Sequence, residues 1–342
     1  MRLSVFKNHD NLLLVGEGNF SFAVMLVEYN LNVTLTATCY EPIVTSEIGK
    51  KNIEYLMKNV GIRVLLGVDA TKLNEHPILK NEYFDKIIFN FPHVGGKMRI
   101  DKNRELLKRF FISSERFLNQ NGQVLVTLCN GQGGTPADSP QRRWDDSWQI
   151  TEMSAHGNFI LTSVEPFDTM LFKNYISTGY RSLDKKFNTQ SSLTHYFVKT
   201  DAPNSRNIAP IMKIDIVDIE KDCNWNDILA IANKKNNMQE KKRDNNRSSI
   251  YPITFKFDIT FSIGSDFNSN KFYMTLYNGA GCIINDVEFL RSYEFSDKRV
   301  TRTYTISYKS EILPLYRKRV IDIHHNIILK LLEDNLHVCV TR

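Results

Sequence analysis

LLLVGEGNFSF, residues 12–22, sets two glycines, Gly16 and Gly18, between a buried strand and the start of a helix. Glycine lets the backbone turn tightly and approach a ligand where a side chain would collide. The helix that follows would offer free backbone N–H groups in its first turn. The segment predicts either a plain strand-to-helix turn or a cofactor-binding turn. Ser21 stands where a dinucleotide-binding pattern has its third glycine, which favours S-adenosylmethionine over a dinucleotide.

Around this turn, short apolar strands alternate with amphipathic helices over the first 200 residues. Strands are expected at Asn11–Val15, Val33–Cys39, Val64–Val68, Lys86–Asn90 and Gly122–Cys129, and helices at Phe20–Tyr29, Ile48–Val60 and Glu105–Leu118. Two later strands, Phe159–Val164 and His195–Lys199, would complete a mixed sheet. Repeated strand–helix–strand units predict a parallel sheet with helices on both faces, which is a Rossmann-like α/β domain.

The remaining sequence predicts a connecting segment and a second domain. Residues 201–232 have room for one strand and one helix, and residues 233–249 are rich in Lys, Asn and Arg. We interpret 201–249 as a connection ending in a solvated linker, with a basic arm as the alternative. From residue 250, strands and a long helix predict a small α+β domain at 250–342; they are expected at Phe255–Ser262, Val300–Tyr308, Leu315–Glu333 and Leu336–Val340.

Composition limits the class of protein. A length of 342 residues suits two domains, and a hydrophobic fraction of 42% excludes a disordered chain. The net charge of +6 is compatible with a polyanionic partner without requiring one. Five scattered cysteines without a CxxC pair argue against a disulfide framework or zinc cluster and for a reducing compartment. No apolar run is long enough to span a bilayer, so we expect a soluble, intracellular protein without a membrane partner.

Two acids follow successive strands of the predicted sheet. Glu41 comes after the second strand, where a nucleotide-binding fold places its ribose-binding carboxylate. Asp69 comes after the third strand, where the adenine amino group is expected. Each acid alone is more commonly a helix cap or a solvated loop residue. Together with the glycine turn, they predict one pocket at the carboxyl edge of the sheet.

The fourth strand ends in Asn90-Phe91-Pro92-His93. A carboxamide and the backbone carbonyl before a proline can orient a planar nitrogen for methylation, and Phe91 can stack on a base. The tetrad resembles the Asn-Pro-Pro-aromatic loop of amino methyltransferases, with Phe91 in place of the first proline; an ordinary turn is the alternative. His93 can assist proton removal, although a lone loop histidine is more commonly polar surface. Lys97 can contact a phosphate.

Two polar segments follow the fifth strand. NGQGGTP, residues 130–136, predicts a flexible glycine loop that could close over the substrate. In RRWDDSW, residues 142–148, Arg142 and Arg143 can pair with phosphate and Trp144 can stack on a base. The alternative is that Trp144 and Trp148, four residues apart, pack one helix onto the core, and we favour this for Trp148.

Several segments together resemble the large-subunit rRNA uridine-N3 methyltransferase family. They are GEGNFSF (16–22), GVDAT (67–71), FNFPHVGGK (89–97), WDDSWQI (144–150) and FDTMLFKNYISTGYR (167–181). The resemblance covers roughly residues 10–200 and implies a methyltransferase domain at 1–200, S-adenosylmethionine as cofactor and methylation of uridine N3. It implies that Gly16, Gly18, Glu41 and Asp69 bind the cofactor, with Glu17 between the glycines, and that the catalytic segment Asn90–His93 lies beside the target base.

Residues 251–342 resemble the ferredoxin-fold anticodon-binding domain of bacterial-type and mitochondrial phenylalanyl-tRNA synthetases. The resemblance is carried by FDITF (257–261), RTYTISYKS (302–310) and LHVCVTR (336–342). It implies an RNA partner, rRNA or tRNA, with contacts from Arg302, Lys309, Arg317 and Arg319. Solvated surface is the alternative for each cation. If this domain grips RNA electrostatically, affinity should fall steeply with salt.

The sequence therefore predicts an α/β Rossmann-like methyltransferase domain plus a small α+β ferredoxin-like domain. The expected activity is methyl transfer to a uridine N3, in rRNA or alternatively in tRNA. An inactive RNA-binding scaffold, a nucleotide-dependent oxidoreductase and an aminoacylation accessory are the other classes left open. The expected compartment is the cytoplasm or nucleolus, and no metal is expected.

Overall fold

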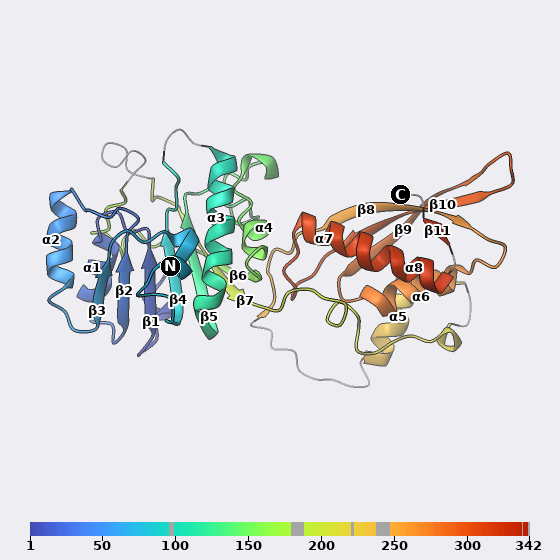
Figure 1. Ribbon diagram of the computed structural model, residues 1–342, viewed down its shortest axis with the longest axis horizontal. Coiled ribbons are helices and arrows are strands. Elements are labelled where there is room, and N and C mark those ends of the chain that lie inside the picture. Colours follow the sequence, from blue (N-terminus) through green and yellow to red (C-terminus); the bar gives the residue numbers. More distant parts are fainter. Residues whose placement is uncertain (96–98, 179–187, 220–221, 237–246, 337, 341–342) are drawn as a thin grey trace. The chain divides into compact units, whose positions relative to one another are not determined.

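The computed structural model describes residues 1–95, 99–178, 188–219, 222–236, 247–336 and 338–340. Lys97 and residues 237–246 of the basic stretch lie outside these ranges. The chain forms two compact units, one of residues 1–200 with 247–251 and the other of residues 201–246 with 252–342. Each unit has its own sheet (Figure 1).

The first unit contains a seven-stranded sheet of order β3-β2-β1-β4-β5-β7-β6. Its strands are β1 (Asn11–Val15), β2 (Thr34–Thr38), β3 (Ile62–Leu65), β4 (Phe84–Asn90), β5 (Leu118–Leu128), β6 (Phe159–Pro166) and β7 (Leu193–Lys199). The pairs among β1 to β5 are parallel, whereas β7 runs antiparallel to both β5 and β6. The strand order reverses between β1 and β4, and a Rossmann-like sheet binds its ligand at such a switch point.

Helices cover both faces of this sheet, with α1 and α2 on one face and α3 and α4 on the other (Figure 1). Their bounds are α1 (Ser21–Glu28), α2 (Glu47–Leu56), α3 (Ile100–Ser114) and α4 (Ile150–Ala155), with short 3-10 turns η1 (Leu3–Val5), η2 (Ala70–Glu75), η3 (Glu115–Phe117) and η4 (Trp144–Asp146). Leu12 and Leu14 of β1 enter one core, and Leu13 and Val15 enter the other. Burial on both faces explains the continuous apolar runs in the central strands, and the sheet with its two helical layers confirms the Rossmann-like prediction.

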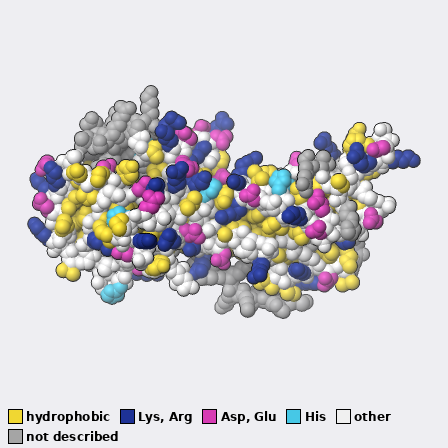
Figure 2. Space-filling model, viewed as in Figure 1, with side chains coloured by type: hydrophobic (Ala, Val, Ile, Leu, Met, Phe, Trp, Pro, Cys, Tyr) yellow, Lys and Arg dark blue, Asp and Glu magenta, His cyan; other side chains and the backbone are white. Residues whose placement is uncertain are grey.

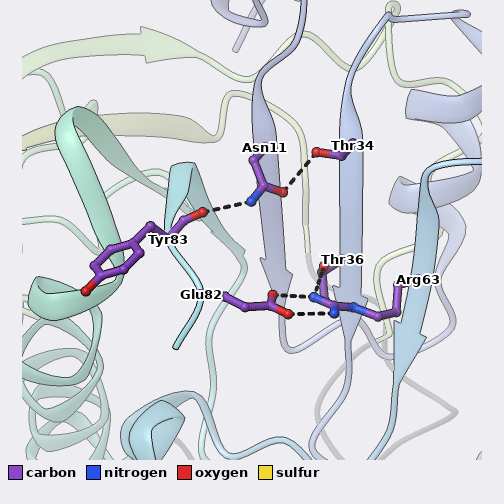
Figure 3. Close-up of polar contacts among 6 residues, drawn as sticks. All are labelled: Asn11, Thr34, Thr36, Arg63, Glu82 and Tyr83. Carbon is purple, nitrogen blue, oxygen red and sulfur yellow. Dashed lines mark hydrogen bonds and ion pairs between the residues drawn. The ribbon is translucent and has the colours of Figure 1, made fainter. Parts of the chain in front are cut away.

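Polar contacts connect the strands at the amino-terminal edge of the sheet, opposite the carboxyl edge where a Rossmann-like fold binds its ligand. The Arg63 guanidinium donates to both carboxylate oxygens of Glu82 and to Thr36 Oγ1, 2.8 Å away (Figure 3). Asn11 accepts from Thr34 Oγ1 and donates to the carbonyl of Tyr83. Because these hydrogen bonds join β1, β2, β3 and the approach to β4, we interpret the cluster as structural, although the buried Arg63 Nε makes no hydrogen bond among the described residues.

The second unit contains an antiparallel sheet of order β11-β8-β10-β9. Its elements are η5 (Ile216–Asp218), α5 (Trp225–Asn236), β8 (Phe255–Ile263), α6 (Ser269–Ala280), β9 (Ile284–Glu294), β10 (Val300–Tyr308), α7 (Arg317–Ile323), α8 (Leu329–Leu336) and β11 (Cys339–Val340). A π-helical turn, His324–Ile328, joins α7 to α8 within the expected long helix. From β8 onward the order is βαββαβ, which confirms the ferredoxin-like prediction.

The predicted connecting segment, 201–249, requires correction. Ile208, Ile214, Trp225 and Ile228 are buried in the same core as the sheet of the second unit. Residues 247–251 instead belong to the first unit, where the Ile250 N–H donates to the carbonyl of Leu161, 2.9 Å away. Apolar side chains spaced along 208–232 therefore build a core instead of a linker. Among the described residues, no helix is both long and apolar enough to cross a membrane.

Candidate functional site

A small pocket lies at the switch point, where the carboxyl ends of β1 and β4 meet. It is lined by Gly16, Glu17, Gly18, Asn19, Asn90, Phe91, Tyr175, Ile176 and Thr178. Five of these residues come from the two segments that the sequence singled out, 16–18 and 90–93. Asn19 and the segment 175–178, which follows β6, were not predicted as site residues. The pocket is therefore where the fold would place a ligand.

The glycine turn is closely packed on both sides. Gly16 has φ +69°, and a Cβ there would lie 2.5 Å from the Phe89 ring. A Cβ at Gly18 would lie 1.8 Å from Thr178 Oγ1. Both glycines are thus required by the approach of protein atoms. The segment Tyr175–Thr178 covers the turn, held by hydrogen bonds between Ile176 and the side chains of Asn19 and Ser21.

The first turn of α1 does not offer the free N–H groups that we expected. The Ser21 N–H donates to Asn19 Oδ1, and the Ala23 N–H donates to Glu17 Oε2 over 3.2 Å. Glu17 also accepts from the Phe22 N–H. Phe20 has φ +61°, a left-handed conformation that turns the chain before the helix and accompanies this contact. A carboxylate of the protein itself therefore occupies the position that a phosphate takes in dinucleotide-binding folds.

Glu17 is buried, with 6% of its surface exposed. Burial raises the pKa of its carboxyl to about 7, although the N–H groups of Ala23 and Phe22 act in the opposite direction. Burial also raises the pKa of the nearby Cys39 thiol to about 12 and that of Tyr175 well above its usual value. Near neutral pH, the carboxyl of Glu17 is thus the group in this cluster that can gain or lose a proton.

Asn90 presents an oriented amide to the pocket. Its Oδ1 accepts from Thr127 Oγ1 over 2.7 Å, and that hydroxyl also contacts Thr194 Oγ1 at 3.0 Å. The two threonines are fully buried on β5 and β7. Asn90 Nδ2 makes no hydrogen bond with any residue that the structure describes. The amide N–H groups are therefore available as donors to a ligand.

Phe91 is buried beneath the segment that follows β6. Its ring stacks on Tyr175 with centroids 6.0 Å apart and meets Phe167 edge-on at 5.7 Å. Phe22 and Phe172 extend this aromatic cluster. Phe91 therefore shapes the pocket wall together with Tyr175, which takes part of its stacking surface.

The other predicted site residues of the first unit lie outside the pocket lining. Glu41 is exposed beyond the end of β2. Asp69 caps η2, its Oδ1 accepting from the Thr71 N–H and hydroxyl at 2.8 and 2.7 Å. Pro92 is buried, and His93 Nδ1 accepts from the Gly95 N–H at 2.9 Å. Burial lowers the pKa of His93. Glu41 and Asp69 lie at the same carboxyl edge of the sheet as the pocket but do not line it. Their roles in binding the cofactor therefore stay predictions.

The glycine loop after β5 is not the flexible lid that we expected. The Asp138 carboxylate accepts from the N–H groups of Gly131 and Thr135, each at 2.9 Å. The carbonyls of Gln132 and Gly133 accept from Trp148 and Ile150. These hydrogen bonds hold the loop against neighbouring backbone, and most of its residues are buried.

Arg142 and Arg143 are exposed, and Arg142 lies beside Gly131 at the carboxyl end of β5. Trp148 is buried in the core, as expected, whereas Trp144 is 37% exposed. Arg104, which the sequence did not single out, donates to the carbonyls of Asp145 and Ser147 at 2.7 and 2.6 Å. It thereby holds the turn that presents Arg143 and Trp144.

The predicted RNA-binding cations of the second unit contact their own unit. The Arg302 guanidinium lies over Phe267 and donates to Ser269 Oγ, and the Arg317 guanidinium lies over Phe257. Arg319 donates to the Pro314 carbonyl, and Lys309 is half-buried at the end of β10. Figure 2 shows Lys and Arg side chains mixed with Asp and Glu on the face in view. RNA binding by these four residues stays a prediction.

Comparison with known proteins supports the resemblance of the first unit to the uridine-N3 methyltransferase family, and the names of two relatives include the ferredoxin-fold anticodon-binding domain. Residues 13–179 match the family described as "rRNA (uridine-N3-)-methyltransferase BTM5-like". Ferredoxin-fold anticodon-binding domain-containing protein 1 of Homo sapiens and its Mus musculus homologue are each 46% identical over 193 residues, covering 55% of this chain and 31% of the relative. The 25S rRNA (uridine(2634)-N(3))-methyltransferase of Saccharomyces cerevisiae is 29% identical over 204 residues, covering 49% of this chain and 59% of that protein. The matched part thus spans about a third of the first two relatives.

Proposed function

We propose, from the match of residues 13–179 to a uridine-N3 methyltransferase family, that this protein methylates N3 of a uridine in ribosomal RNA with S-adenosylmethionine. The observation that carries the proposal is the switch-point pocket, which joins the glycine turn to Asn90. The proposal places the protein inside the cell, in the cytoplasm or the nucleolus, where ribosomal RNA occurs.

The groups around the pocket suit S-adenosylmethionine better than a dinucleotide. A dinucleotide requires its pyrophosphate at the first turn of α1, where the Glu17 carboxylate already accepts the N–H groups and would repel it. S-adenosylmethionine has no phosphate and carries a positive sulfonium, which a carboxylate favours. Glu41, at the end of the neighbouring β2, is available for the ribose hydroxyls. This chemistry disfavours the oxidoreductase alternative.

The residues beside the pocket suit a uracil ring as methyl acceptor. The bound cofactor supplies an activated methyl group, so the protein mainly aligns the acceptor nitrogen with it. N3 of uracil lies between two carbonyl oxygens, and the Asn90 amide can donate to one of them. The Thr127 hydroxyl fixes the amide oxygen of Asn90, so the Asn90 N–H groups are already oriented toward the ligand before it binds. N3 is also on the pairing edge, so the uridine must be unpaired or flipped out.

RNA contact is proposed for two regions. Arg142 and Arg143 are exposed at the carboxyl edge that holds the pocket, where they can meet phosphates. The ferredoxin-like unit provides the second region, by its resemblance to an anticodon-binding domain. That resemblance favours tRNA as the second candidate substrate, and the experiment below separates the two.

The test is incubation of the purified full chain with labelled S-adenosylmethionine and separate rRNA and tRNA pools, followed by nucleoside mass spectrometry. We expect 3-methyluridine in the rRNA pool. Its appearance only in tRNA would move the substrate to the second candidate. Absence from both pools, with cofactor binding shown by calorimetry, would contradict the proposal and favour an RNA-binding scaffold.

Asn90→Ala tests the role of the amide. We expect turnover to fall about 100-fold or more, with little change in the Kd for S-adenosylhomocysteine, because the amide would contact the base. Thr127→Val keeps the buried volume and removes only the hydroxyl that orients Asn90, so its loss should be smaller. Wild-type turnover in Asn90→Ala would remove Asn90 from the active site.

A further inference from the structure

Glu17 has a feature that cofactor binding alone does not explain. It is the only carboxyl among the described residues that line the pocket, and it lies there with Asn90, the proposed contact to the base. Its side chain is almost fully buried, and at least one of its oxygens is anchored on the first turn of α1. A buried carboxyl that lines the same pocket as the proposed contact to the base is a candidate general base.

We propose that Glu17 accepts the N3 proton of the target uridine during methyl transfer, an inference that rests on the proposed function. N3 gives its proton to the Glu17 carboxylate, and the freed electron pair forms the bond from N3 to the methyl carbon. The bond from that carbon to sulfur breaks, and its electron pair stays on sulfur as the thioether. The positive charge on sulfur and the negative charge on Glu17 are thus both lost in one step, which leaves the buried site neutral.

The surroundings of Glu17 suit the transfer of a proton to its carboxylate. Cys39 follows β2 and Tyr175 lies in the segment that covers the pocket, and both interact electrostatically with Glu17; Cys129 interacts in turn with Tyr175. All three have raised pKa values and stay neutral near pH 7. The pKa of Glu17 itself, about 7, lies where a base can both take up and release a proton at neutral pH. A sulfonium beside it would favour ionisation before transfer, and loss of that charge would favour protonation afterwards.

His93, the base suggested by the sequence, is less well placed. It does not line the pocket, and its Nδ1 already accepts from the Gly95 N–H. Its ring lies near Trp148, with centroids 6.2 Å apart. The geometry therefore assigns proton removal to Glu17.

The first test measures proton exchange on cofactor binding, without RNA. Calorimetry in two buffers of different ionisation enthalpy should show release of about half a proton per S-adenosylmethionine at pH 7, because a group with that pKa is half protonated there. S-adenosylhomocysteine, which lacks the sulfonium charge, should release clearly less. Glu17→Gln should remove the difference between the two ligands, whereas Glu28→Gln, at an exposed acid of α1, should keep it.

The second test measures single-turnover methylation of the RNA pool against pH. Wild type should gain rate as pH rises toward 7. Glu17→Gln, which keeps an acceptor for the Ala23 N–H, should lose about 100-fold or more in rate together with this rising limb. His93→Gln should keep the rise in rate toward pH 7, whatever the absolute rate of this variant. A Glu17→Gln protein with the wild-type rate and pH profile would overturn the inference. Failure of the proposed function would instead show as no 3-methyluridine from wild type.

Discussion

Replacement of Glu17 by Gln should stabilise the first unit at neutral and alkaline pH. The pKa of this carboxyl is about 7 in the folded protein and about 4.5 ordinarily, so the folded state binds more protons than the unfolded state between these values. The contribution of Glu17 to stability is therefore most favourable below pH 4.5 and is lost as pH rises through 7. A pKa rise of this size corresponds to about 3 kcal/mol. Gln is neutral throughout and still accepts a hydrogen bond from α1.

The assay is urea unfolding of the full chain at pH 4.5, 6 and 8, followed by tryptophan fluorescence. Trp225→Phe serves as the common background, because the remaining tryptophans, Trp144 and Trp148, both belong to the first unit. The free energy of unfolding of the Glu17→Gln variant, relative to the background, should rise by about 3 kcal/mol from pH 4.5 to pH 8. A difference that is constant with pH, or that falls as pH rises, would refute the assignment of a buried, partly neutral carboxyl.

Three further changes test the same unit. Burial lowers the pKa of His195 to about 4, so the protein loses stability through this group as pH falls from 6.5 to 4. His195→Gln should remove up to about 3 kcal/mol of that loss, measured by urea unfolding. An unchanged dependence of the free energy of unfolding on pH in this range would contradict the prediction. Asp10→Asn should cost about 3 to 5 kcal/mol, because Lys86 would stay buried without its ion-pair partner, whereas a cost below about 1 kcal/mol would mean a solvated pair. Gly18→Ala should cost about 1 to 3 kcal/mol through its clash with Thr178, and Thr178→Gly in the same chain should lose less than the sum of both changes, which a double-mutant cycle measures.

The opposite signs for Glu17 and His195 have a joint consequence. Between about pH 4.5 and 6.5, one group loses stability as pH rises and the other gains it. Their effects nearly cancel, so the wild-type first unit should show a flat stability profile in this range. The single variants should uncover slopes of opposite direction.

The sheet of the first unit was predictable because its pattern is local. A strand buried on both faces carries a continuous apolar run, and Leu12–Val15 of β1 and Ile87–Phe89 of β4 form such runs. In the second unit, β9 was missed because its outer half exposes Phe289, Leu290 and Tyr293, which hides the alternation of apolar and polar residues.

The contact of Glu17 with its neighbouring helix could not be predicted in the same way. Its contact with the first turn of α1 accompanies the left-handed conformation of Phe20, which a bulky residue rarely adopts. Tyr175 and Arg104 were missed for a different reason. Their partners, Phe91 and the turn at Trp144–Asp146, lie 84 and about 40 residues away in the chain, and only the folded structure brings them together.

The return of residues 247–251 to the first unit decides how the protein can be dissected. The chain passes from one unit to the other after residues 200, 246 and 251, so no single cut separates them. A fragment ending at residue 200 would lack the Ile250 N–H that bonds to Leu161, and one beginning at 252 would lack Trp225 from its core. Each unit thus consists of two separate segments of the chain. Expression of one unit alone would require its two segments to be joined by a designed connection, because truncation at a single site would not give the whole unit.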